Sequence, residues 1–85
     1  MNPNMLNKLK KMQKQMVEAQ EQLERKEYFG KASGVTVIMQ GTRQVIDVQI
    51  NPEMLEEAEL LQDSILLAVN DALKQIEKEQ EETMG

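Results

Sequence analysis

A short β-branched stretch lies between two much longer stretches of helical pattern, and it constrains most strongly what this chain can fold into. Its two halves, VTVIMQ at 35–40 and VIDVQI at 45–50, alternate and are separated by a turn that contains Gly41. This pattern predicts a β-hairpin with one face toward water. A third short strand around 28–32 is a further alternative.

The alternation in the second half places three apolar residues on one face, namely Ile46, Val48 and Ile50. An isolated two-stranded hairpin is only marginally stable. The hairpin therefore needs cover from a helix, pairing with another strand, or a second hairpin from another copy of the chain.

The first 27 residues predict one long amphipathic helix. Asn2 or Asn4 is a suitable N-cap, and Pro3 occupies a position that the first helical turn tolerates. Apolar residues recur at alternating spacings of four and three, which is an a/d pattern over about three heptads. We call these residues the seam: Met5, Leu9, Met12, Met16, Ala19 and Leu23. The pattern fits a partner helix in the same chain and equally one in a second chain.

The last 35 residues predict a second helical region that is acidic. Asn51, Pro52 and Glu53 form a helix start, with a cap, a proline at the first position and an acid at the positive end of the helix dipole. We expect a short turn over 52–57 and then a long helix from about residue 59. The run ILLAV at 65–69 is apolar nearly all round, which predicts burial on more than one side. The polar run EKEQEE is expected to project into solvent or fray.

The order of elements predicts an α+β fold in a single domain over residues 1–85. Its parts are a basic helix at 1–27, a β-hairpin region at 28–50 and an acidic helical region at 51–85. Each long helix would span roughly 35 Å, so we expect the helix ends to project beyond the core. A chain of 85 residues without cysteine or histidine buries a modest core that neither disulfides nor zinc can supplement. Dimerisation is therefore expected.

The composition also argues against most kinds of catalytic site and metal site. The absence of cysteine and histidine removes thiol nucleophiles, histidine bases and thiolate or imidazole zinc sites, which leaves only a carboxylate metal site in principle. Ser33 and Ser64 have no histidine to activate them, and no phosphate-binding glycine loop is present. We expect no enzyme, no catalytic residue, no cofactor, no metal and no small-molecule substrate.

The sequence likewise predicts no membrane association. No apolar run approaches the roughly 20 residues of a membrane span, and the basic start lacks the apolar core of a secretory signal. The lack of cysteine fits a cytoplasmic location.

Positive charge is concentrated at the front of an acidic chain. The net charge is −5 overall, but it is +3 over residues 1–31, zero over 32–51 and −8 over 52–85. The segment NKLKKMQKQM holds four lysines and no acid. On the heptad register these lysines lie away from the centre of the seam. We call them the basic stripe: Lys8, Lys10, Lys11 and Lys14.

The basic stripe has a functional interpretation and a plain one. Dense positive charge without a means of reading bases suits the phosphates of duplex DNA, whereas four solvated lysines on an outward helix face need no partner. Arg43, in the hairpin turn, is likewise either a phosphate contact or simply exposed. Tyr28 and Phe29 are the only aromatic residues, so stacking of single-stranded bases has almost nothing to use.

Three segments together resemble the YbaB/EbfC family of bacterial nucleoid-associated proteins, and the resemblance covers essentially the whole chain. They are MLNKLKKMQKQMVEAQEQLERKE, the hairpin GVTVIMQGTRQVIDVQI, and NPEML followed by LLQDSILLAVNDALKQIEKEQEETMG. The most specific parts are VQINPEML and LLAVNDALK. The resemblance implies a tweezer-like homodimer, with hairpins joined in one shared antiparallel sheet and long helices that project as arms.

The same resemblance implies function. It implies a cytoplasmic protein of the nucleoid that binds double-stranded DNA with little sequence preference and influences nucleoid organisation or gene expression. In the family, DNA contact is attributed to the arms. The matching basic positions are those of the basic stripe, with Arg25, Lys26 and Lys31 as weaker ones.

A second hypothesis belongs to another class. The chain would be a dimeric adaptor whose seam or acidic helix end binds a recombination or replication protein. DNA would not be contacted directly, and the lysines would only aid solubility.

Overall fold

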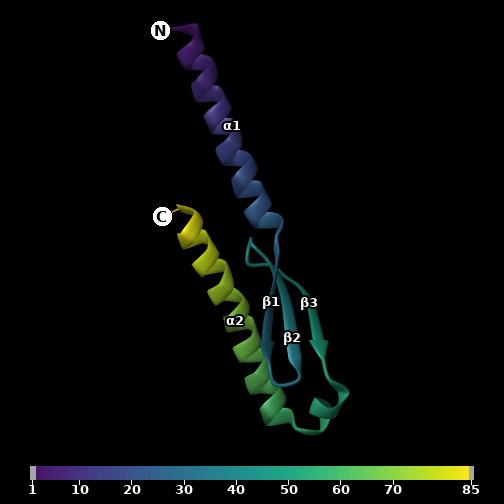
Figure 1. Ribbon diagram of the computed structural model, residues 1–85. Coiled ribbons are helices and arrows are strands. Elements are labelled where there is room, and N and C mark those ends of the chain that lie inside the picture. Colours follow the sequence, from purple (N-terminus) through teal and green to yellow (C-terminus); the bar gives the residue numbers. More distant parts are fainter. Residues whose placement is uncertain (1, 85) are drawn as a thin grey trace.

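The structure is a computed structural model that describes residues 2–84, and it is strongly elongated, with extents of 68 × 20 × 11 Å. A three-stranded antiparallel sheet lies beside one long helix, and the other long helix leads away from the sheet (Figure 1). The elements are α1 (Pro3–Arg25), β1 (Glu27–Ala32), β2 (Val35–Gln40), β3 (Val45–Ile50), the 3-10 helix η1 (Pro52–Glu56) and α2 (Ala58–Met84). The α+β fold is thus confirmed, and the third strand is present as β1.

Local hydrogen bonds and backbone geometry define both ends of helix α1. The Asn2 side chain accepts a hydrogen bond from the backbone of Asn4 at 3.0 Å, so Asn2 is the N-cap. The helix ends when Lys26 becomes extended, while its N–H still donates to the carbonyl of Gln22 at 3.0 Å.

No residue of α1 is buried. The four outer apolar residues of the seam, Met5, Leu9, Met12 and Met16, are between 50% and 71% exposed. The seam pattern allowed a partner helix in the same chain or in a second chain. In the described residues no helix of the same chain packs against the seam, so a second chain is the partner that is still open.

The sheet has the order β1–β2–β3, and its register decides which residues face α2. Tyr28 pairs with Met39 and Gly30 pairs with Val37. A bulge between Ile38 and Met39 shifts the second ladder, and pairing resumes on β3 at Val45 rather than at the next residue. A bulge of this kind leaves one residue of a strand unpaired.

The predicted apolar face of β3 is therefore only partly right. Val48 and Ile50 pair with Val37 and Val35, whose side chains are buried, but Ile46 is the residue that the bulge skips.

The core lies between α2 and the first two strands. Its buried apolar residues include Tyr28, Val35, Val37 and Met39 on the sheet and Ala68, Ala72 and Ile76 on α2. Small residues allow the helix to lie directly on β1. A Cβ added at Gly30 would overlap the carbonyl oxygen of Ala68 and lie 2.7 Å from the backbone nitrogen of Ala72.

The outer side of α2 does not match the expectation that residues 65–69 are buried on more than one side. Leu66 and Leu67 are each 60% exposed, because the single chain has only one sheet face to offer this helix. The region before it is as expected: η1 forms, and the Asn51 side chain accepts from the backbone of Glu53 at 3.1 Å.

The two edges of the sheet differ. At β1, the Lys31 N–H donates to Asp71 Oδ2 at 3.0 Å, and Gln75 Nε2 donates to the Phe29 carbonyl at 2.8 Å. Two side chains of α2 thus occupy backbone groups of the β1 edge. At β3, Val45 and Val48 are 43% and 44% exposed, and no comparable side-chain cover exists in residues 2–84.

Candidate nucleic-acid interface

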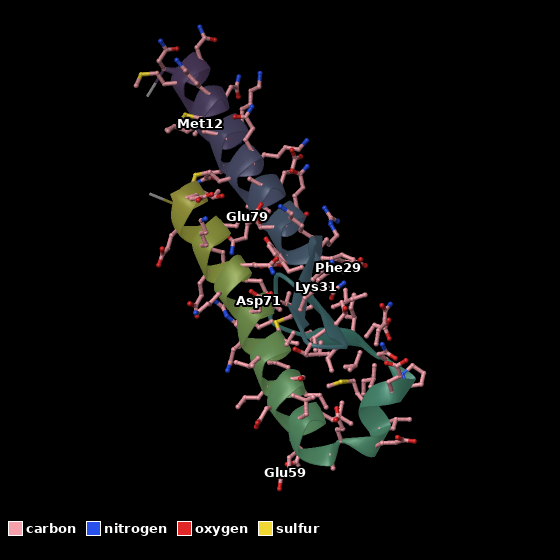
Figure 2. The ribbon with its side chains drawn as sticks, turned by 60° about the horizontal axis from the view of Figure 1, so that its bottom comes forward. Met12, Phe29, Lys31, Glu59, Asp71 and Glu79 are labelled. Atoms are coloured by element: carbon pink, nitrogen blue, oxygen red, sulfur yellow. The ribbon has the colours of Figure 1, made fainter. Side chains whose placement is uncertain are left out.

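The basic stripe lies on the outer half of α1. All four of its lysines are exposed, and the first acid along the helix is Glu18. At about 1.5 Å per residue the 23 residues of α1 extend roughly 34 Å. Figures 1 and 2 both show this outer half reaching beyond the C-terminal end of α2. The stripe therefore projects beyond the acidic end of α2, which carries Glu77, Glu79, Glu81 and Glu82. Salt screens the repulsion between exposed charges that lie more than about 10 Å apart.

The seam and the stripe share α1 but face different ways. Successive residues turn by about 100° in an α-helix, which places Lys10 and Lys14 on the side opposite Met12 and Met16, with Lys11 beside them and Lys8 on the flank of the seam. Met12, labelled in Figure 2, marks the outer part of the helix. A duplex on the lysine side would leave the apolar side free.

Two other predicted DNA contacts, Lys26 and Arg43, lie at the base of α1 and face α2. The Lys26 ammonium forms an ion pair with Glu79 at 2.6 Å, and Arg43 Nη2 donates to Gln80 Oε1 at 3.2 Å. Arg43 has a positive φ of 71°, which is rare for a residue other than glycine. Figure 2 shows Glu79 near the C-terminal end of α2, which comes close to the base of α1. The structure does not bring these two cations to the stripe.

Tyr28 lies beneath Lys26. The Lys26 ammonium is 5.4 Å from the centroid of the Tyr28 ring, a distance at which a cation–π attraction acts. Burial of the ring raises the pKa of Tyr28 to about 12, and the nearby Glu79 carboxylate adds to this rise. The hydroxyl oxygen is buried and has no hydrogen-bond partner of good geometry among the described residues, so we regard the Glu79 influence as mainly one of charge.

The pKa of Glu79 moves the other way. The hydrogen bond from Lys26 lowers it most, and the positive charge of Lys26 adds to this effect. Glu79 is therefore the point at which the end of α1, the start of β1 and α2 interact electrostatically.

The remaining two predicted residues are separate from both groups. Arg25 is exposed in the last turn of α1, where a cation is favourable beside the helix dipole. Lys31 lies near the far end of β1 and lines a shallow hollow of about 410 Å³. The other residues of this hollow are Ala32, Ser33, Leu67, Asn70, Asp71 and Lys74. Lys74 comes to this place from the acidic third of the chain, and sequence reasoning missed it because only the tertiary fold places it beside Lys31.

Other kinds of site find little support. In the described range, 2–84, no group of three or more acidic side chains is placed to hold a metal ion. None of the helices in that range combines the length and the apolar composition that crossing a bilayer requires.

Comparison with known proteins adds a family. Residues 1–85 match the model of the YbaB/EbfC DNA-binding family. A nucleoid-associated protein of Enterococcus faecalis is 44% identical over 85 residues, which cover 95% of this chain and 82% of that relative. A nucleoid-associated protein of Metamycoplasma arthritidis is 38% identical over 85 residues, covering 96% of this chain and 90% of that protein.

A solved structure shares the fold. The crystal structure of an uncharacterized protein from Helicobacter pylori superposes with a TM-score of 0.76 at 25% identity, covering 99% of this chain and 94% of that one. The family description and the names of the relatives concern DNA binding and the nucleoid, and they do not describe an enzyme.

Proposed function

This chain belongs to the YbaB/EbfC DNA-binding family, and we propose that it is a nucleoid-associated protein that binds duplex DNA through the basic stripe of α1. The observation that carries the proposal is the exposed outer half of α1, which has four lysines and no acid before Glu18. The protein would act in the cytoplasm at the nucleoid and influence nucleoid organisation and gene expression.

The chemistry of the stripe favours affinity without sequence preference. Lysine ammonium groups bind phosphate as point charges and release condensed counterions from the duplex. Arginine, the side chain that most often reads guanine in the major groove, is absent from the stripe. Of the two aromatic residues, Tyr28 is buried and Phe29 lies on the sheet, so neither offers a stacking platform on α1.

A homodimer is the unit that we propose for binding. Its support is the apolar surface that one chain leaves open, namely the β3 edge with Val45 and Val48 and, on α2, Leu66. Asp71 and Gln75 occupy the β1 edge, so β3 is the edge at which a second copy can continue the sheet. Pairing of two β3 strands would give one shared sheet with two projecting arms.

The test is fluorescence anisotropy of a random-sequence duplex across a salt series. Two stripes of four lysines offer up to eight phosphate contacts, so the slope of log K against log salt should approach about −7. The variant Lys10→Glu/Lys11→Glu should lose binding at moderate salt. The matched control is Lys74→Glu/Lys78→Glu, which changes the net charge equally on α2 and should reduce affinity far less.

Four results would count against the proposal. Binding that persists unchanged in high salt contradicts the phosphate mode, and equal losses in both variants contradict the site. If no DNA binds even at low salt, the adaptor hypothesis is favoured. The observation that supports this hypothesis is the exposed seam, which could bind another protein. A stable folded monomer of 9.8 kDa in sedimentation equilibrium at micromolar concentration refutes the dimer.

A further inference from the structure

The base of α1 is joined to the rest of the molecule with no intervening loop. Helix α1 ends at Arg25 and β1 begins at Glu27, so Lys26 alone connects them. The backbone N–H of Gly41, in the turn between β2 and β3, donates to the Lys26 carbonyl at 3.1 Å. Gly41 also lies directly against the last turn of α1, because a Cβ at that position would overlap the carbonyl oxygen of Leu23.

Two neighbouring residues of α2 complete the junction. Glu79 binds the Lys26 ammonium at 2.6 Å, and Gln80 accepts from Arg43 at 3.2 Å. Gln80 Nε2 also lies 3.5 Å from the Gly41 carbonyl. One turn of α2 therefore contacts both the end of α1 and the hairpin turn that supports it. We call these residues the arm-base cluster: Lys26, Gly41, Arg43, Glu79 and Gln80.

The direction of α1 depends on this cluster. Since no residue of α1 is buried, packing along its length does not hold it against the sheet or against α2. A lysine stripe that must meet several phosphates at once binds better when its carrier is already oriented, because less freedom is lost on binding. The cations at the base of the arm thus have a task that differs from that of the cations on its outer half.

We propose that Lys26 and Arg43 are positioning residues, which orient α1 through Glu79 and Gln80 and do not themselves contact phosphate. This inference rests on the proposed function, in which the stripe of α1 binds DNA. It separates the basic residues of the chain into phosphate contacts on the outer half of α1 and residues that hold α1 at its base.

The variant Glu79→Gln distinguishes positioning from direct contact by the sign of its effect. The change removes an acid near the arm and releases Lys26. If Lys26 bound phosphate, or if only net charge mattered, DNA would bind more tightly. If Lys26 positions the arm, DNA binds more weakly although the protein has become less acidic.

The matched control is Glu82→Gln. Glu82 lies about one turn further along α2, is exposed, and makes no hydrogen bond among the described residues. The Glu82→Gln substitution removes the same charge at a similar place on α2. We expect it to leave the affinity unchanged or slightly raised, while Glu79→Gln lowers it roughly three- to tenfold through loss of preorganisation.

A charge exchange supplies the rescue. In Lys26→Glu/Glu79→Lys the ion pair is rebuilt in reverse and the net charge is that of the parent chain. A positioning role predicts that affinity returns to within about twofold of the parent, since the arm is again held. A phosphate contact at position 26 predicts a further loss, because an acid now stands where the cation was.

A measurement without DNA keeps this inference separate from the proposed function. Backbone ¹⁵N relaxation should show α1 and the sheet tumbling as one body in the parent and in Glu82→Gln, and α1 moving independently in Glu79→Gln. If the parent protein binds no duplex, the proposed function fails and the relaxation data alone test the cluster. Unchanged relaxation in Glu79→Gln, affinity that is equal or higher in that variant, or failure of the charge exchange to restore binding overturns the positioning role.

Discussion

The two long helices have similar lengths but opposite relations to the core. Helix α1 has 23 residues, none of them buried, whereas α2 has 27 residues and contributes Ala68, Ala72 and Ile76 at 0% exposure. The cause lies in the residues that face inward. Helix α2 presents small side chains that fit closely over β1, whereas the outer, methionine-rich part of the seam on α1 stays exposed among the described residues.

Charge follows the same division. The outer half of α1 is basic, whereas α2 carries seven acids against two lysines. A helix that builds the core can be acidic outside without harm, but a helix that is to meet phosphate cannot. We therefore expect changes in the contact between α2 and the sheet to alter stability more than changes on the exposed face of α1, and the first two predictions below test that division.

The largest effect is expected where α2 touches β1. Gly30→Ala would place a methyl group against the backbone of Ala68 and Ala72, which cannot move aside as a side chain would. We expect a loss of about 3 kcal/mol or more in the free energy of unfolding, at the upper end for an overpacked core. Urea unfolding followed by circular dichroism, at one fixed protein concentration, measures it.

The companion variant on α1 is Gln20→Ala, an exposed helical site. It should change the unfolding free energy by no more than about 0.5 kcal/mol. If Gly30→Ala were as stable as this control, the close packing of α2 on β1 would be wrong.

A second comparison concerns the unfolding free energies of two variants in which an apolar side chain is truncated. Ile76→Ala truncates a fully buried side chain on the inner face of α2 and should lower the free energy of unfolding by about 2–5 kcal/mol. Met12→Ala removes a side chain that is 52% exposed on α1, and in a dimer joined through β3 it should cost less than about 1 kcal/mol. Chemical unfolding of both variants gives the comparison. A cost for Met12→Ala near that for Ile76→Ala would show instead that a second copy covers the seam.

Features that depend on neighbouring residues were predictable from the sequence. The caps at Asn2 and Asn51 follow from side chains that reach backbone two residues away, and both form. The placement of Lys10, Lys11 and Lys14 away from the seam follows from helical geometry alone. The strands follow from alternation, which a partly buried sheet requires.

Features that depend on distant residues were not predictable. Lys26 meets Glu79 and Arg43 meets Gln80 across 53 and 37 positions of sequence, so no local pattern indicates these pairs. The β3 bulge depends on how β2 and β3 fit together, and it leaves Ile46 without a partner on β2. Residues 65–69 were expected to be buried on several sides. They are not, because a single chain covers only one side of this part of α2.

The smallest expected effect concerns Tyr28, where the end of α1 and the inner face of α2 meet. Because the folded state favours the neutral phenol, its pKa rises from about 10 to about 12. The stabilisation that this shift represents is fully present below about pH 10 and is lost as the pH rises through about 12. Around neutral pH the stability therefore does not vary with the ionisation of Tyr28.

The chain has one tyrosine and no tryptophan, so the absorbance of tyrosinate reports Tyr28 alone. We expect a native midpoint near pH 12 and a midpoint near 10 in denaturant, with circular dichroism confirming that the fold persists during the native titration. Glu79→Gln should lower the native midpoint without returning it to the denatured value, because burial is the larger cause. A native midpoint near 10 would mean that α2 does not cover Tyr28. An unchanged midpoint in Glu79→Gln would mean that the Glu79 charge does not reach the ring, and the electrostatic link between the base of α1 and α2 would then rest on Lys26 alone.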